Sequence, residues 1–138
     1  MKMLVAISTG ALLLSTAAFA QPMAAGGSGL MTSVPSSSLT VTDWYKQDVY
    51  DPSNAKIGEI MDVLVAKDGH VQAAIVGVGG FLGAGEKDVA VSFSSIKKTM
   101  KDDKVYLTLD TTKDALKKAP GFKYDSTKTT WVPDKSSE

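Results

Sequence analysis

The segment "IGEIMDVLVAKDGHVQAAIVGV" (Ile57–Val78) predicts a β-hairpin at the centre of the protein. Two apolar runs rich in β-branched residues flank the polar turn "KDG", as is typical of paired strands. Gly69 can adopt the positive φ that a tight hairpin turn requires. We therefore expect residues 57–66 and 71–78 to pair as antiparallel strands.

Two acidic residues complicate the first of these strands. Glu59 and Asp62 are three residues apart, so on a regular strand their side chains leave opposite faces. No single register then exposes both carboxylates to solvent. A β-bulge between Gly58 and Met61, or a strand covered on both faces, would resolve the conflict, and the sequence leaves both open.

Alternating apolar residues predict further strands on either side of the hairpin. The alternation covers residues 88–93 and 105–109. The polar segments Asp51–Asn54 ("DPSN") and Lys101–Lys104 ("KDDK") are typical turns. Six short strands joined by tight turns indicate a mainly β protein. We expect a small antiparallel β-barrel, because closing the sheet removes its exposed edges.

One short helix is expected after the strands, in residues 111–120 ("TTKDALKKAP"). A threonine can cap its N-terminus, and Asp114 in the first turn complements the positive end of the helix dipole. Lys117 and Lys118 suit the opposite end, and Pro120 stops the helix.

The N-terminus has the pattern of a secretory signal peptide. Lys2 gives a positive start, residues 4–14 are apolar, and Ala18–Ala20 form an A-x-A-like cleavage site. The apolar run is too short for a transmembrane helix, so we expect no membrane span after cleavage and a periplasmic or extracellular protein. The expected segments are a signal peptide (1–20), a flexible Gly/Ser/Ala/Pro-rich arm (21–42), a β domain (43–110) and a helix with a tail (111–138).

The composition excludes several classes of function. Basic and acidic residues both number 15, so the chain lacks the positive charge typical of nucleic-acid-binding proteins. All the basic residues are lysine, which weakens any hypothesis of bidentate phosphate recognition. With no cysteine and with His70 as the one histidine, we expect no thiolate or multi-histidine metal site and no cofactor.

The glycine-rich segment "GVGGFLGAGEKDVAV" (Gly77–Val91) superficially resembles a nucleotide-binding loop. A dinucleotide fingerprint started at Gly77 would need glycine where Leu82 stands, and a P-loop would need Ser or Thr where Asp88 stands. The residues that follow alternate as a strand, so no helix N-terminus is available for an anion. We interpret the segment as a long hairpin connection with Phe81 and Leu82 as its apolar tip.

In order, these motifs resemble the PRC-barrel domain, a family found in the photosynthetic reaction centre H subunit and in a ribosome maturation factor. The resemblance covers residues 43–109. It rests on the strand around Gly58 and Asp62, the "DG" turn at Gly69, and the segment "GGFLGAGEKDVAV" at residues 79–91. Ser92 departs from the proline that the family often has there. The resemblance implies a small β-barrel that serves in binding or assembly and has no known catalytic residues.

Few residues are candidates for chemistry. Glu59 and Asp62 could form a carboxylate pair, and His70 could act as a base beside a serine, but no nucleophile motif accompanies them. The aromatic residues Trp44, Tyr45 and Phe81 are the better signal: they either serve in core packing or edge protection, or form an exposed patch for a protein or glycan partner. The candidate partner-binding residues are Gly80, Phe81, Leu82, Gly83, Trp44 and Tyr45, and the candidate structural residues are Gly58, Asp62, Gly69 and Gly79.

The sequence therefore favours an exported, non-enzymatic binding module. We expect it to hold a protein or envelope partner through the glycine-rich loop and the adjacent strand ends. The alternatives are a small ligand-binding or hydrolytic barrel that uses Asp62, His70 or a nearby serine, and a self-associating structural protein of the envelope or of a stress response.

Overall fold

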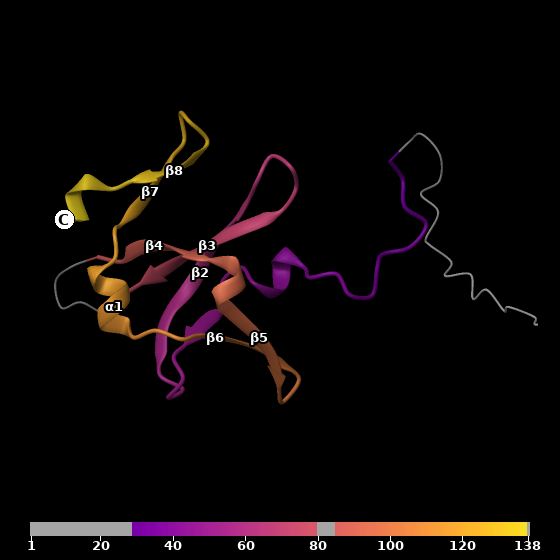
Figure 1. Ribbon diagram of the computed structural model, residues 1–138, viewed down its shortest axis with the longest axis horizontal. Coiled ribbons are helices and arrows are strands. Elements are labelled where there is room, and N and C mark those ends of the chain that lie inside the picture. Colours follow the sequence, from indigo (N-terminus) through magenta and orange to yellow (C-terminus); the bar gives the residue numbers. More distant parts are fainter. Residues whose placement is uncertain (1–28, 80–84, 138) are drawn as a thin grey trace, which may run out of the picture. The chain divides into compact units, whose positions relative to one another are not determined.

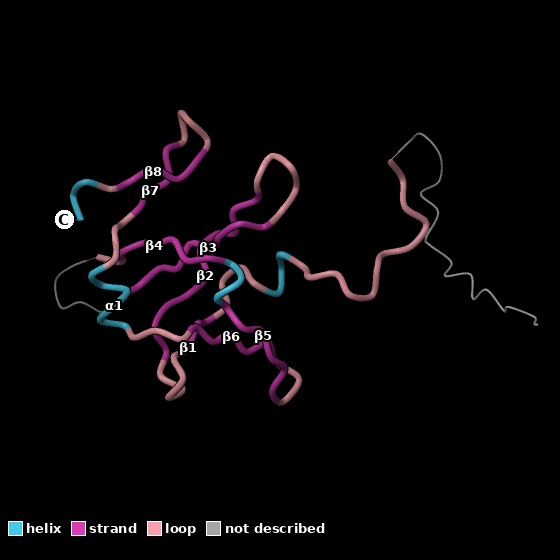
Figure 2. The backbone as a smooth tube through the Cα atoms, viewed as in Figure 1, coloured by secondary structure: helices cyan, strands magenta, loops and turns pink. Residues whose placement is uncertain are grey.

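A computed structural model describes residues 29–79 and 85–137. The chain divides into two compact units, Met1–Ser38 and Leu39–Glu138. In the first unit, the described residues 29–38 contain no helix or strand. The expected signal peptide and the loop tip from Gly80 to Gly83 lie outside the described residues. Figure 2 distinguishes the strands, helices and connections of the second unit.

The second unit is mainly β, as expected. Its described part contains a single α-helix, α1 (Lys113–Lys118), and one mixed sheet of eight strands in the order β5-β6-β1-β2-β3-β4-β7-β8 (Figure 1). The strands are β1 (Asp48–Tyr50), β2 (Lys56–Val65), β3 (Val71–Val78), β4 (Lys87–Ser92), β5 (Ile96–Lys101), β6 (Lys104–Leu109), β7 (Phe122–Asp125) and β8 (Thr130–Pro133). The 3₁₀ turns are η1 (Val41–Asp43), η2 (Phe93–Ser95) and η3 (Lys135–Ser137).

The expectation of a closed, antiparallel barrel is corrected by the sheet topology. The sheet is open, with β5 and β8 at its edges, and β1 runs parallel to β6. Both edges have features that discourage pairing with another strand: lysines along β5 and Pro133 in the short β8. Within the described residues, the edges of the sheet are therefore protected by side chains and not by closure into a barrel.

The conflict at Glu59 and Asp62 is resolved by a bulge. In the antiparallel ladder with β3, Glu59 lies opposite Gly77 and Asp62 lies opposite Ile75, so Met61 is the extra residue. Because Gly77 and Ile75 share one face of β3, the two acidic residues also share a face. The expectation that they leave opposite faces is therefore wrong, since one inserted residue shifts the parity of everything after it.

The predicted turns have the expected backbone geometry. Gly69 has φ 91° in the β2–β3 turn, and Asn54 has φ 66° in the turn before β2. Asp102 and Asp103 have φ 51° and 59°, which is the pattern of a type I′ hairpin between β5 and β6. The helix is also confirmed, with the Thr112 hydroxyl accepting a hydrogen bond from the N–H of Ala115.

The main hydrophobic core lies on one face of the central strands. Val49, Ile60, Val76, Val89 and Leu107 are fully buried there and come from five different strands. Other members arrive from flanking elements, among them Trp44 after η1 and Leu116 of α1. The core thus joins β1–β4, β6 and the helix in one packed layer.

The C-terminal tail adds a hairpin to the sheet. β7 joins β4 through the single pair Asp88–Phe122, and β8 then pairs with β7. The indole N–H of Trp131 in β8 donates a 2.8 Å hydrogen bond to the carboxylate of Asp62 in β2. Since Asp62 shares its face with Ile75, this bond brings β8 to the face opposite the main core. Ile75, on that face, is fully buried.

Candidate functional site

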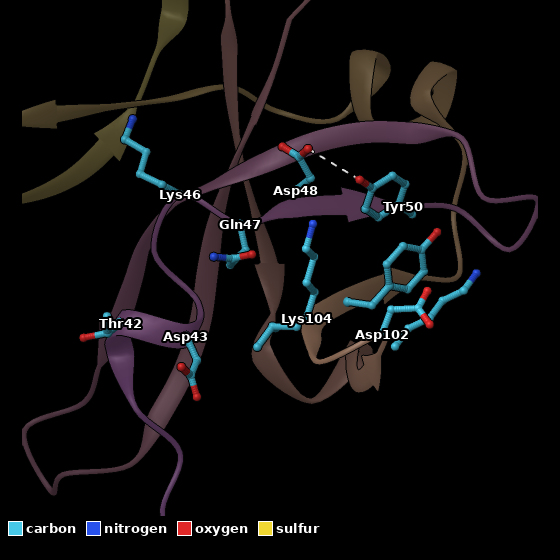
Figure 3. A pocket seen from close by; sticks show the side chains of 11 residues that line it. Thr42, Asp43, Lys46, Gln47, Asp48, Tyr50, Asp102 and Lys104 are labelled. Atoms are coloured by element: carbon cyan, nitrogen blue, oxygen red, sulfur yellow. Dashed lines mark hydrogen bonds between the residues drawn. The ribbon is translucent and has the colours of Figure 1, made fainter.

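A cleft of about 730 Å³ lies where β1 and β6 diverge, and we call it the β1–β6 cleft (Figure 3). Its walls come from η1 and the residues after it, from β1, and from the β5–β6 hairpin. Its lining consists of Thr42, Asp43, Lys46, Gln47, Asp48, Tyr50, Lys101, Asp102, Lys104, Val105 and Tyr106.

The short pairing of β1 with β6 explains why the cleft exists. Only Val49–Leu107 and Tyr50–Thr108 are paired in this parallel ladder. The residues that precede these pairs line the cleft instead of pairing with each other: 47–48 at the start of β1, and 104–106 on β6. On its other side β6 is paired with β5 along its whole length. Residues 104–106 therefore have one paired edge and one edge that faces the cleft.

Two stacked tyrosines form the aromatic part of the cleft. The rings of Tyr50 and Tyr106 have centroids 4.4 Å apart and an interplanar angle of 13°. The Tyr106 hydroxyl donates to Asn54 at 3.0 Å, and the Tyr50 hydroxyl lies 3.5 Å from Asp48. Burial and the nearby Asp48 charge raise the pKa of Tyr50, so its hydroxyl stays protonated at neutral pH. The pair is held at both hydroxyls and forms an ordered aromatic surface.

The cleft carries charges of both signs, and half of the charged residues in its lining have ion-pair partners. Asp43 pairs with Lys98 at 2.8 Å, and Asp48 pairs with Lys56 at 2.6 Å. The hydrogen bond from Lys98, followed by that from Thr40, lowers the pKa of Asp43. Similarly, the hydrogen bond to Asp48 raises the pKa of Lys56. Both lysine partners lie outside the cleft lining.

Charged groups at the β5–β6 end of the cleft are less committed. Lys101 lies over the Tyr106 ring, with its amino group 5.6 Å from the centroid. Figure 3 shows Lys104 extending from β6 into the space between the two strands. Across the described ranges, no ion pair engages Lys101, Lys104 or Asp102. Lys101 and Lys104 are therefore available to attract a negatively charged group of a ligand.

The polar candidates for catalysis do not converge. His70 is largely exposed on the β2–β3 turn and contacts Asp68 at 3.2 Å. Asp62 shares a face with Glu59, but its carboxylate accepts hydrogen bonds from the Val63 N–H and from Trp131. No set of three His, Cys, Asp or Glu side chains suited to a metal ion occurs among residues 29–79 and 85–137.

Of the expected partner-binding residues, Trp44 and Tyr45 fall in different environments. Trp44 is 3% exposed and packs against Phe93, with ring centroids 4.3 Å apart, so it belongs to the core. Tyr45 is 51% exposed and is available at the surface. Gly80, Phe81, Leu82 and Gly83 lie outside the described residues.

The candidate structural residues have distinct environments. A Cβ on Gly58 would come within 2.8 Å of the Gly77 carbonyl oxygen, so the close backbone approach requires glycine. Gly69 has the positive φ noted above, whereas a Cβ on Gly79 would meet no atom within 4 Å. Asp62 accepts hydrogen bonds from the Val63 N–H and from the indole of Trp131, so its role is structural.

Sequence reasoning missed the role of Tyr106 and Lys104. In the run "VYLTL" of β6, Tyr106 alternates with Val105 and Leu107, which puts an aromatic ring on the polar side of the strand. An aromatic residue on the polar side of a strand was the signal in the sequence that could have pointed to Tyr106. The pairing of β6 with β1, which brings Tyr106 against Tyr50, depends on topology and has no local signature.

The model of the PRC-barrel domain family matches residues 38–116, more than half of the chain. The chain belongs to the PRC-barrel domain family. The matched region contains β1–β6 and every residue that lines the β1–β6 cleft, whereas the β7–β8 hairpin follows it. The comparison with curated proteins gave no match.

Proposed function

We propose that this PRC-barrel domain is a non-catalytic binding module that holds a protein partner in the β1–β6 cleft. The observation that carries the proposal is the ordered tyrosine pair, Tyr50 and Tyr106, beside uncommitted charged side chains in a cleft of about 730 Å³. Tyrosine is enriched at protein interfaces, because it offers a large contact area and a hydrogen bond at little entropic cost.

The balance of charge supports a protein partner over nucleic acid. The cleft lining contains Lys46, Lys101 and Lys104 together with three aspartates, and the whole chain has no net charge. A nucleic-acid site would present a predominantly positive surface to the phosphates. Aromatic residues with a polar rim are instead typical of protein interfaces.

A non-catalytic role is supported by the separation of the reactive side chains. His70 is exposed on the β2–β3 turn, is not part of the cleft lining, and contacts Asp68. A base of that kind needs a nucleophile within hydrogen-bonding reach. The family resemblance likewise implies no catalytic residues.

We also propose that the protein is exported, on the basis of the N-terminal sequence pattern. In the described part of the chain, no helix is both long and apolar enough to span a bilayer. Mass spectrometry of the protein purified from its native host tests the proposal. The expected mature N-terminus is Gln21, and an intact Met1 or Lys2 start in the cell extract would contradict it.

Site-specific crosslinking tests the binding role. A photo-crosslinking amino acid replaces Thr42 or Asp102, which line the cleft, or Lys67 on the distant β2–β3 turn as the matched control. In the native host, we expect one protein to crosslink at both cleft positions and not at Lys67. The same adduct at all three positions, or none in the cleft, would reject the cleft as the working surface.

Two tyrosine variants complete the design. Tyr106→Ala removes half of the stacked pair, whereas Tyr124→Ala removes an exposed tyrosine of β7, outside the cleft. We expect the first to lose the crosslinked partner and the second to retain it. A third variant, Phe81→Ser with Leu82→Ser, tests the glycine-rich loop as a second contact. Loss of the partner in that variant would extend the interface to the loop.

A further inference from the structure

The backbone of β6 offers hydrogen-bonding groups to the cleft. In an antiparallel ladder, the N–H and C=O of alternate residues point toward the paired strand and away from it. The two-residue turn at Asp102–Asp103 makes Lys101–Lys104 the first bonded pair with β5, so Lys104 and Tyr106 face β5. The backbone of Val105 therefore points to the opposite side, into the cleft.

The pairing with β1 agrees with this assignment. Leu107, two residues after Val105, pairs with Val49 on the cleft side of β6. The same edge of β6 is thus used by β1 at Leu107 and is vacated at Val105, where the strands diverge. On this edge of β6, none of the described strands pairs with Val105, whose opposite edge is paired with β5.

We propose that the β1–β6 cleft receives an extended segment of the partner, which adds to the sheet at Val105. This inference rests on the proposed function and specifies the form in which the partner binds. Addition of a strand to an exposed edge provides affinity through main-chain hydrogen bonds and specificity through alternate side chains. The edge from Lys104 to Tyr106 spans roughly 10 Å, which suits a segment of about three to five residues.

The side chains of β6 define the chemistry of that segment. Lys104 and Tyr106 lie on one face of the strand and Val105 lies on the other. The first face has positive charge from Lys104 and Lys101, neither of which has an ion pair within residues 29–79 and 85–137. The second face has the half-buried Val105, which packs against the main core. The matching segment alternates acidic and apolar residues.

The charges near this edge also disfavour its pairing with a second copy of the chain. Lys101, Asp102, Asp103 and Lys104 surround the end of the β5–β6 hairpin, and charged side chains at an edge oppose association of like strands. A segment with acidic side chains would be attracted by the same lysines. The edge therefore selects among strands by charge.

Two synthetic peptides test the proposal with the full mature chain. The probes are a capped heptapeptide of sequence TVEVEVT and its counterpart TVKVKVT, titrated into ¹⁵N-labelled protein. We expect the acidic peptide to bind and to slow hydrogen exchange at the Val105 N–H. The Tyr106 N–H, which faces β5, is the internal control and should keep its exchange rate.

A charge reversal sharpens the test. Lys104 is exposed, so Lys104→Glu should fold, and the folded state is checked by its NMR spectrum. We expect this variant to lose up to roughly fivefold in affinity for the acidic peptide, because an exposed ion pair contributes only about 1 kcal/mol. The preference for TVEVEVT over TVKVKVT should shrink or invert. An unchanged preference would overturn the charge assignment.

The results also separate this inference from the proposed function. Binding of neither peptide, or binding without slower exchange at Val105, would overturn strand addition. If the crosslinks at Thr42 and Asp102 still identify one partner, the binding role stands and the partner contacts the cleft by side chains alone. If those crosslinks are absent as well, both proposals fall.

Discussion

The two faces of the central strands are buried by different means. The core face is covered by aliphatic side chains from five strands and α1, among them the fully buried Ile60. The opposite face also contains a fully buried isoleucine, Ile75, and the β7–β8 hairpin reaches this face through the hydrogen bond from Trp131 to Asp62. That hairpin joins the sheet through one residue pair at Asp88 and one hydrogen bond from Trp131.

The difference indicates how each face responds to substitution. Stability on the core face comes from apolar area and packing shared by many residues. On the hairpin face, few contacts attach the β7–β8 hairpin, and the partly buried carboxylate of Asp88 belongs to the residue pair that joins it to the sheet. Substitutions in the core should therefore affect global unfolding, whereas substitutions under the hairpin should first affect its local opening.

The largest expected effect comes from truncating the core. Ile60→Ala should lower the free energy of unfolding by about 2–5 kcal/mol, because it removes apolar contacts and leaves a cavity in a packed layer. Ile75→Ala removes the same atoms at the same burial on the other face. We expect a smaller loss there, since the hairpin can settle over the space. Urea unfolding measures both values, and a larger loss for Ile75→Ala would reverse the comparison.

The hairpin contact gives the next largest effect. Trp131→Phe keeps an aromatic ring near Tyr124 but removes the 2.8 Å hydrogen bond to Asp62. The expected loss is about 1.5–3 kcal/mol, the usual range for hydrogen bonds to charged groups. Hydrogen exchange should accelerate in residues 122–125 before it does in β3. Tyr124→Phe, at an exposed position, is the control. Equal acceleration throughout the sheet would mean that the hairpin does not open separately.

Backbone contact on the core face gives a third, more modest effect. Gly58→Ala places a Cβ 2.5 Å from Val76 Cγ1 and 2.8 Å from the Gly77 carbonyl oxygen, so β2 and β3 must move apart. We expect a loss of about 1–3 kcal/mol, as for other overpacked sites. Gly79→Ala meets no atom within 4 Å and serves as the matched control. Thermal unfolding that ranks the two substitutions equally would contradict the close approach.

Local chemistry made much of the fold predictable. The positive φ at Gly69 and Asn54 and the Thr112 cap each depend on residues adjacent in sequence. The family resemblance was equally local, since its turn, glycine segment and strand occur in order. Sequence reasoning succeeds here because turn and cap energetics are settled within a few residues.

Long-range pairing could not be predicted in the same way. The Met61 bulge was one of two open alternatives, because only the ladder with β3 shows which residue is extra. The Tyr50–Tyr106 stack and the Trp131–Asp62 bond join residues 56 and 69 positions apart, with no local pattern to link them. Closure of the sheet was expected on general grounds, and the charged β5 edge made it unnecessary. The candidate cleft depends on these long-range features.

The smallest expected effect concerns Asp88, on the hairpin face. Burial, and secondarily the charge of Glu86, raise the pKa of Asp88 above its ordinary value of 3.8, and one of its carboxylate oxygens has no hydrogen-bond partner in the described structure. Because the folded state raises this pKa, the stability contributed by Asp88 is complete below pH 3.8 and is lost as the pH rises through the raised value. At pH 7 the charged carboxylate therefore opposes folding.

Asp88→Asn removes that charge, so the variant should unfold at a higher urea concentration than the wild type at pH 7. The difference should shrink as the pH approaches 3.8, where the wild-type carboxyl is protonated. Carboxylates in turns, such as Asp51 and Asp125, have lowered pKa values, so their protonation in acid lowers the stability of both proteins by the same amount. Their effect cancels in the difference between the wild type and Asp88→Asn. Asp110→Asn, at an exposed position, is the control. If the wild type is more stable to urea than Asp88→Asn at pH 7, the carboxylate must have a partner that stabilises its charge. The Trp131 contact would then be the one remaining difference argued between the two faces.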